Sequence, residues 1–411
     1  MEAAATPFDV PRRPTVFAFI LVTVLLDMLS LGIVVPVLPK LVVDFTGGDT
    51  EKAARIFGIF GATFALMQFL ISPMRGVLSD RFGRRPLVLI SNFGVAIDYI
   101  LMALAPTAAW VFAGRVISGT TAGSIPLGYA YATDVTPPDK RAARFALLGV
   151  AISAGFIFGP ALGGYASTIS PRLPFWIAAG LSLVNASYGI LLLPESLPRS
   201  RRAAFRWQRA NPVGALVLLR SHSELVGLAC VNFLINLAQA GLPSVGVLYM
   251  SYRYGWDERV IGLTMASFSI AGIIVQGVVV APVTRQIGER ATLALGLTFG
   301  GLGFVVLAMA WTGAAFWLGI PFVALWGLAN PALLALMSRS VGGSEQGLLQ
   351  GSNSSIIGIA GLFGPVLLTQ TFAFAIGTGR AWQLPGAPFL VAAVLLAFAG
   401  IAAWRVTRAG S

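Results

Sequence analysis

Long apolar runs recur along the whole chain, and they constrain its fold more than any other feature. A transmembrane helix needs about 20 consecutive apolar residues to cross the hydrocarbon core of a bilayer. Runs of that length follow one another through the 411 residues, with short polar turns between them. Only 11% of the residues are charged, whereas a soluble domain carries about 25%. The sequence therefore predicts an all-α polytopic membrane protein that has the lipid bilayer as its partner.

Twelve candidate membrane spans follow from the hydropathy pattern. They cover residues 15–39, 55–78, 86–105, 109–133, 143–167, 174–193, 223–249, 258–283, 291–311, 314–339, 347–373 and 385–405. The first span is too long for the apolar region of a cleavable signal peptide, and it lacks a small-residue cleavage site. We therefore expect it to be a membrane helix.

Basic residues are distributed unevenly between the two sides that these spans define. With the N-terminus inside, 20 of the 28 Lys and Arg residues fall in cytoplasmic segments, Arg75 among them, and 7 fall on the other side. Arg115 alone is expected inside a span. Short cytoplasmic loops carry the excess of positive charge, so both termini are predicted to be cytoplasmic. This bias accounts for the formal net charge of +12 without a nucleic-acid partner.

The chain contains signs of an internal duplication. An offset of 205 residues superimposes several glycines and prolines, namely Gly83 on Gly288, Pro126 on Pro331, and Gly159-Pro160 on Gly364-Pro365. Matches at one offset indicate a tandem repeat. The longest polar stretch, which is rich in Arg, lies between the two copies. We expect two pseudo-symmetric six-helix bundles, at 1–193 and 223–411, joined by a cytoplasmic linker at 194–222.

The turn between the second and third spans has a dense charge pattern. It reads G-V-L-S-D-R-F-G-R-R-P from Gly76 to Pro86. Glycine lets the backbone turn sharply, and proline suits the first turn of the next helix. The plain interpretation is a basic loop that holds the topology. The functional interpretation is a conformational latch made by Gly76, Asp80, Arg81, Gly83 and Arg84, with Asp134 from the end of the fourth span.

Three ionisable residues are predicted inside the membrane: Asp27, Asp98 and Arg115. A charge at mid-membrane costs a few kcal/mol, so each of them needs a reason. A carboxyl held away from water can take up and release a proton during transport, whereas Arg stays charged and must find an anion or water. Asp27 is alternatively tied to an arginine or to open backbone near Pro36. Asp98 either pairs with Arg115 or faces a substrate cation, and Arg115 is alternatively a fixed ion-pair partner or snorkels toward a membrane face.

The fifth span carries small residues at intervals of four. These are Gly155, Gly159 and Gly163, with Pro160 beside them. Such glycines allow another helix to approach closely, and an internal proline permits a kink. The pattern predicts a hinge, although close packing explains the glycines equally well.

The second half offers uncharged polar and aromatic groups within its spans. Those that could contact a substrate are Asn232, Asn236, Gln239, Trp326, Asn330 and Asn353. The first three follow an i, i+4, i+7 spacing and share one helix face. They either hydrogen-bond a substrate or join helices to one another.

Enzymatic chemistry has no support in the sequence. The chain has one cysteine, Cys230, and one histidine, His222, so a cysteine cluster and a histidine metal site are not expected. No nucleophile–base pair or phosphate-binding loop stands out. We expect no metal and no cofactor, and no enzyme.

Four motifs together resemble those of the major facilitator superfamily, in particular its twelve-helix drug/proton antiporters and most of all the tetracycline-efflux family. They are G-x-x-x-D-R-x-G-R-R at 76–85, L-D-x-x-x-x-G-I-V-V-P-V-L-P around Asp27, G-R-x-x-S-G at 114–119 and G-x-x-x-G-P-x-x-G-G at 155–164. The resemblance implies a bacterial inner-membrane transporter, monomeric and energised by the proton gradient. It would export a small amphipathic compound or drug by alternating access around a central cavity.

The resemblance also implies residue roles. Asp27 and Asp98 match acids that handle protons and substrate, Arg115 matches an arginine assigned to proton transfer, and Gln68 matches a polar residue of the drug path. Asp80 would cap the span that begins near Gly347, and Asp134 would pair with Arg84. Tetracycline exporters carry a functional His and Asp in spans 8 and 9, and these spans here have no His and only outer-end charges. The identity of the drug is therefore left open.

Two other functions are compatible with the sequence. A proton-coupled importer of an organic solute would use the same buried acids. A non-transporting membrane receptor would have intramembrane charges that are dispensable. The direction of proton movement and the presence of counterflow separate these alternatives from export.

Overall fold

A computed structural model describes residues 14–203, 211–212, 214–218, 223–342 and 345–409. The predicted linker 194–222 lies partly outside these residues, and so does His222. The helices of the first half are α1 (Pro14–Val34), α2 (Leu38–Phe45), α3 (Thr50–Phe82), α4 (Arg84–Leu104), α5 (Ala108–Thr121), α6 (Ser124–Val135), α7 (Arg141–Ile169) and α8 (Leu173–Leu192). Short 3-10 turns follow at Pro138–Lys140 and Arg199–Arg201.

The second half begins after a 3-10 turn at Gly214–Val217. Its helices are α10 (Ser223–Gln239), α11 (Val247–Tyr254), α12 (Glu258–Ile274), α13 (Val280–Met309), α14 (Gly313–Leu325), α15 (Ala329–Arg339), α16 (Gln346–Ile376) and α17 (Ala387–Ala409). Two π-helical turns, Leu242–Gly246 and Val275–Val279, interrupt this series. Two 3-10 turns, Trp326–Leu328 and Arg380–Trp382, do so as well.

The membrane-protein class is confirmed. Within the described ranges, ten helical runs are long and apolar enough to cross a bilayer. The predicted span 109–133 is absent from these ten because it is broken into α5 and α6 at Ala122 and Gly123. The predicted spans 258–283 and 291–311 lie in one continuous run, 258–309, which turns at Gly288. The arrangement is consistent with twelve crossings.

The two loop glycines of the proposed repeat share one backbone property. Gly83 has a φ of 109° and Gly288 a φ of 77°. L-residues with a side chain rarely adopt a positive φ, so glycine is suited to both turns. The match found at the level of sequence therefore corresponds to equivalent turns in the fold.

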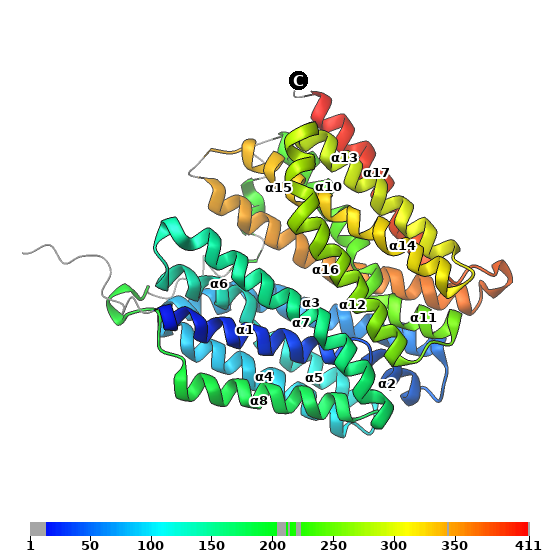
Figure 1. Cartoon of the computed structure of the whole chain (residues 1–411), viewed down its shortest axis with the longest axis horizontal. Helices are drawn as coiled ribbons and strands as arrows, with labels where there is room; N and C mark the ends of the chain where they lie inside the picture. The colour runs from blue at the N-terminus through cyan, green and yellow to red at the C-terminus, as the bar shows by residue number, and fades with distance from the viewer. Residues whose placement is uncertain (1–13, 204–210, 213, 219–222, 343–344, 410–411) are drawn as a thin grey trace, which may run out of the picture.

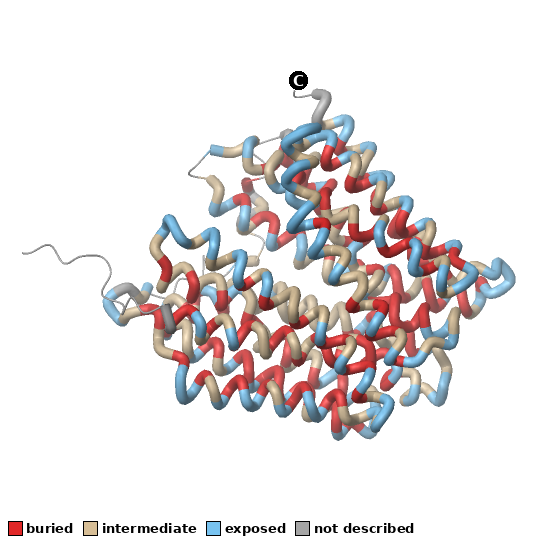
Figure 2. Tube along the Cα trace, viewed as in Figure 1, coloured by how far each residue is buried: buried red, intermediate tan, exposed pale blue. Residues whose placement is uncertain are grey.

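The helices form two groups (Figure 1). In the first, α1 packs against α7 and α8, and α4 packs against α5 and α8. In the second, α13 packs against α14 and α17, and α10 packs against α16 and α17. Two hydrophobic clusters fill the first group and a large one fills the second. Figure 2 shows buried residues along the inner sides of these helices and exposed residues along the outer sides.

Two helix pairs connect the groups, α3 with α16 and α7 with α12. Glycines allow these helices to approach closely. A Cβ added at Gly58 would clash with Thr369, and one added at Gly262 would clash with the Pro160 carbonyl. A Cβ added at Gly61 would lie 3.0 Å from Pro365 Cβ. All these contacts lie in the predicted outer part of the helices.

Toward the predicted cytoplasmic face the same helices separate. The positions where Cβ atoms would stand at Gly76 and Gly149 have no neighbouring atom within 4 Å. The ribbons diverge in the same direction, toward the side where α1 begins (Figure 1). The two groups therefore touch from the predicted outer face to about the middle of these helices, where Ser269 Oγ donates to the Phe156 carbonyl at 3.1 Å, and they do not touch at Gly76 and Gly149.

Candidate transport site

An ion pair between Asp98 and Arg115 lies inside the first group of helices. The Arg115 guanidinium donates to the Asp98 carboxylate across α4 and α5. Only 1% of the Asp98 side chain and 12% of the Arg115 side chain are exposed. A side chain at position 114 would clash with Asp98, so Gly114 makes room for the pair. Of the two interpretations of Asp98, the structure shows the pairing with Arg115.

Asp27 has a different environment. It lies in the middle of α1 and is 8% exposed, and the Ser124 hydroxyl at the start of α6 is its hydrogen-bonding neighbour. Within the described part of the chain no ion pair to Asp27 is formed. This conformation therefore does not show the alternative in which Asp27 is paired with an arginine.

A buried tyrosine experiences the field of all three intramembrane charges. The buried phenol of Tyr99 on α4 interacts electrostatically with Asp27, Asp98 and Arg115. Sequence reasoning did not select Tyr99, although it directly follows Asp98. A sequence match cannot show that this ring stands among all three charges, because α1, α4 and α5 each contribute one of them.

Arg75 is a correction to the predicted topology. It was assigned to a cytoplasmic segment, but it lies inside α3, where it is only 7% exposed. Residue 75 already falls within the predicted span 55–78, near its end, and α3 continues past it to Phe82. Its Nη2 donates to Gln68 Oε1 at 3.1 Å, which links it to the residue matched to a drug path.

The charged turn forms a network around Arg84. Arg84 Nη1 lies 2.6 Å from Asp80 Oδ1 and Arg84 Nε lies 3.0 Å from Asp134 Oδ2. Arg84 thus makes the contact with Asp134 that the resemblance implies. In addition, Glu195 accepts hydrogen bonds from the backbone N–H groups of Arg84 and Arg85. Glu195 was not among the predicted residues, because nothing local marks it as part of this turn.

The expected contact between Asp80 and the start of α16 is not formed in this conformation. Asp80 pairs with Arg84, and a Cβ added at Gly347 would have no neighbour within 4 Å. Arg81 is exposed and stacks over Phe82 at 5.2 Å. The separation of α3 from α16 at this face explains why Asp80 does not reach the helix.

Polar residues of the second half divide into two kinds. Asn232 Nδ2 donates to Asn353 Oδ1 at 3.2 Å, and Asn236 Nδ2 donates to Asn232 Oδ1 at 2.9 Å. These three amides join α10 to α16, which matches the alternative in which they hold helices together. Gln239 and Asn330 are exposed and stand apart from this network. Trp326 is half-buried and packs against Phe304 with ring centroids 5.4 Å apart.

The glycines of α7 face α1 within the same group. A Cβ at Gly159 would lie 2.6 Å from Gly32 Cα, one at Gly155 would lie 2.6 Å from the Met28 carbonyl carbon, and one at Gly163 would clash with the Ile33 carbonyl. These positions therefore serve close packing, and the hinge stays a prediction. The Pro160 carbonyl lies against Gly262 of α12, so the opposite side of α7 contacts the second group.

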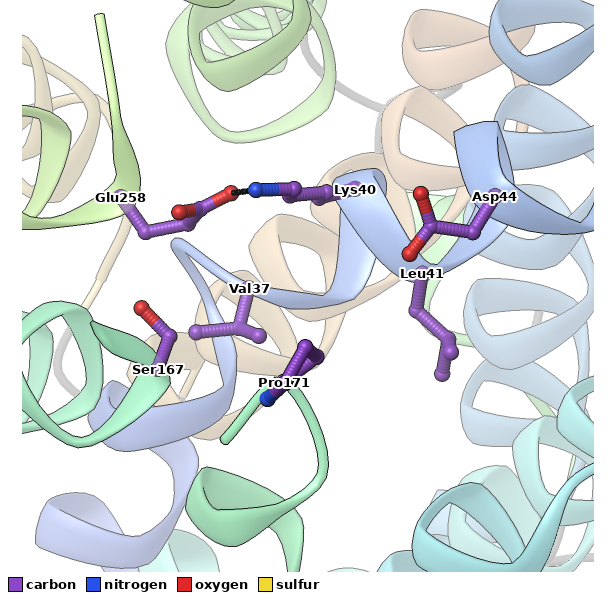
Figure 3. A pocket seen from close by; sticks show the side chains of 7 residues that line it. All are labelled: Val37, Lys40, Leu41, Asp44, Ser167, Pro171 and Glu258. Atoms are coloured by element: carbon purple, nitrogen blue, oxygen red, sulfur yellow. Dashed lines mark ion pairs between the residues drawn. The ribbon is translucent and has the colours of Figure 1, made fainter. Parts of the chain in front are cut away.

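An ion pair joins the two groups at the predicted outer face. Lys40 Nζ lies 2.7 Å from Glu258 Oε1, and the side chains are 51% and 11% exposed. Figure 3 shows this pair above a small pocket that Val37, Leu41, Asp44, Ser167 and Pro171 complete. Arg55 on α3 also donates to Gln370 on α16 at 3.0 Å. Neither pair was predicted, because each joins residues more than 200 positions apart.

Known proteins resemble this chain over nearly its whole length. The chain is 36% identical to "Tetracycline resistance protein, class C" of Escherichia coli over 377 residues, which cover 90% of this chain and 94% of that protein. It is 34% identical to "Tetracycline resistance protein, class G" of Vibrio anguillarum over 377 residues, covering 90% and 93%. The solved structure of the nucleoside transporter NupG superimposes with a TM-score of 0.80 at 13% identity, covering 95% of this chain and 100% of that one. This last likeness concerns the fold alone.

A family profile gives the assignment. The profile described as "Major Facilitator Superfamily" matches residues 20–365 and 228–410. Together with the helical membrane fold and the relatives, this match identifies a transporter and not an enzyme. The chain belongs to the Major Facilitator Superfamily.

Proposed function

We propose that this protein exports a small amphipathic organic compound in exchange for protons. One observation carries the proposal: the first helix bundle of a membrane transporter buries an acid without an ion-pair partner among the described residues, Asp27, together with the ion pair of Asp98 and Arg115. Intramembrane acids of this kind are rare and mark proton and substrate pathways. The names of the relatives, tetracycline resistance proteins, support a drug as the cargo.

Asp27 is the proposed coupling acid. Asp98 is neutralised by Arg115, whereas Asp27 has no ion-pair partner among the described residues and has the Ser124 hydroxyl as a hydrogen-bonding neighbour. A carboxyl without a counter-ion is easily protonated and can give up the proton when a substrate approaches. Substrate binding and protonation then exclude each other, and each drives the release of the other.

Alternating access is the proposed mode of transport. Contacts between the two groups of helices extend from the predicted outer face, where Lys40 and Glu258 pair, to about the middle of the helices, and are absent at Gly76 and Gly149. Export requires a second state in which this pair separates and the charged turn around Arg84 approaches α16. The two predicted bundles, 1–193 and 223–411, serve as the rigid units of this motion. We further propose a monomer in a bacterial inner membrane, with both termini in the cytoplasm.

The test uses proteoliposomes that contain the full chain and a trapped pH indicator. Tetracycline and ethidium serve as cargo probes. With an imposed proton gradient, the Asp27→Asn variant should lose uphill accumulation and keep part of the downhill exchange, because neutral Asn cannot exchange a proton. Asp139→Asn changes an exposed acid on the predicted cytoplasmic side, outside the membrane helices, and is the control that should transport normally.

The same assay separates the alternatives. Without a gradient, a probe that enters in exchange for protons makes the lumen more alkaline, as export by antiport requires. Acidification of the lumen would indicate the importer. No counterflow of any probe would indicate the receptor, and unchanged uphill transport by Asp27→Asn would refute the coupling role.

A further inference from the structure

Arg75 carries a charge that nothing in the described protein neutralises. It lies within the membrane helix α3 at 7% exposure. Its Nη2 donates to the Gln68 amide oxygen at 3.1 Å, and its Nη1 is buried without any hydrogen-bond partner among the described residues. Arginine is not deprotonated in proteins, and a buried charge is costly unless it is paired. The site therefore lacks an anion.

The neighbouring acids are already occupied by a different arginine. Asp80 and Asp134 both pair with Arg84, at 2.6 Å and 3.0 Å, and Ser79 accepts from Arg84 Nη1 at 2.9 Å. The two arginines thus differ: Arg84 is compensated by two carboxylates and Arg75 by a neutral amide. Among the described residues, no carboxylate forms an ion pair with Arg75.

A cavity of about 80 Å³ is lined by both Arg75 and Arg84. Its lining contains the two arginines, the hydroxyls of Ser72 and Ser79, and the small and apolar residues of α6, but no acid among the described residues. Gly123, at the break between α5 and α6, forms the wall beside the free nitrogen, and a Cβ there would stand 3.0 Å from Arg75 Nη1. A side chain at this position would crowd that nitrogen.

We infer that Arg75 binds an anionic group of the transported compound, most simply a carboxylate. A planar guanidinium matches a carboxylate in geometry as well as in charge, and the two serine hydroxyls can donate to the same oxygens. The cavity holds a few water-sized volumes at about 30 Å³ each, so it accommodates one charged end and not a whole drug. The apolar wall of Pro126 and Leu127 suits the adjoining part of an amphipathic molecule.

The binding part of this inference stands independently of transport, and the statement that the anion belongs to the cargo rests on the proposed function. The probes are three aryl carboxylates, 2-naphthoate, indole-3-acetate and 4-phenylbenzoate, each compared with its neutral primary amide. Binding to the purified full chain is measured by ligand-induced thermal shift. At least one carboxylate should bind about tenfold or more tightly than its amide, as expected for hydrogen bonds to a charged group.

Three variants test the role of Arg75. Arg75→Gln should abolish the preference for the carboxylate. Ser72→Glu, one helical turn away, supplies an internal carboxylate and should abolish the preference even if Arg75→Gln does not fold. Arg290→Gln removes an exposed arginine from the same predicted face and should keep the preference. Equal binding of every carboxylate and its amide, or a preference that survives in Arg75→Gln and Ser72→Glu, would overturn the inference.

Two further arms identify the source of the anion. If inorganic phosphate competes with the carboxylate at similar concentration, the site binds a free ion. If nanodiscs of anionic lipid suppress carboxylate binding, the site binds a lipid headgroup; either result excludes the cargo.

Uphill transport of the neutral amides separates failure of this inference from failure of the proposed function. If Arg75→Gln still moves a neutral probe uphill but not the carboxylate, both stand. If the wild type drives no probe uphill, the proposed function fails while the carboxylate preference still decides the role of Arg75.

Discussion

At the residue scale, the pairing of Asp98 with Arg115 governs what either residue can do. The pair is buried, and removing one partner from a buried ion pair leaves an uncompensated charge at a cost of about 3 kcal/mol or more. We predict that Asp98→Asn lowers the thermal unfolding temperature in detergent. The double variant Asp98→Asn with Arg115→Gln should regain part of the loss, because no lone charge is left. A double variant less stable than both single variants would contradict a direct pair.

The surroundings of each residue in the sequence also explain which intramembrane charges could be predicted and which could not. Asp27, Asp98 and Arg115 could be selected as intramembrane charges because each stands alone in an apolar run. Arg75 was misplaced because it lies near the end of its run, where a span and a loop have the same composition. Its burial depends on α5 and α6, which cover it at Gly123.

At the element scale, the glycines of α7 allow two helices to touch along their backbones. A Cβ at Gly159 would stand 2.6 Å from Gly32 Cα and 2.9 Å from Ile33 N. Gly159→Ala should therefore force α1 and α7 apart and destabilise the protein by about 1–3 kcal/mol, in the range of overpacked cores. Gly180→Ala in α8 is the control, because a Cβ there has no neighbour within 4 Å and alanine favours a helix. Comparing the thermal unfolding temperatures of the two variants tests this prediction, and equal stability would refute the packing role of Gly159.

At the scale of the whole molecule, the Lys40–Glu258 pair links the two groups of helices where they meet. Half of the lysine side chain is exposed, so the pair contributes less than about 1 kcal/mol. A two-state equilibrium is sensitive to such amounts, and Lys40→Gln should shift the population toward the outward-open state by roughly two- to fivefold. Distances between spin labels across the predicted outer face would report the shift.

The control for this shift is Lys52→Gln. Lys52 pairs with Asp49 within the first group, at 3.4 Å, so its loss should leave the distances between the groups unchanged. Raising the ionic strength should imitate Lys40→Gln, because salt screens exposed pairs. Identical distance distributions in the wild type and in Lys40→Gln would show that the pair does not bias the two states.

Sequence by itself determined the all-helical membrane class, the sharp turns at Gly83 and Gly288, and three of the intramembrane charges, Asp27, Asp98 and Arg115. These are local properties: hydropathy, span length and the need for a positive φ can be read from one segment without its neighbours. Only the tertiary structure decided that Asp98 meets Arg115 while Asp27 does not, that the Asn232 amide is satisfied by Asn353, and that the two halves touch at Lys40 and Glu258. Such pairings depend on distances between helices that are far apart in the chain. Every apolar helix in a bilayer can turn several faces to its neighbours, so no single segment specifies which polar group of another helix its own polar groups will contact.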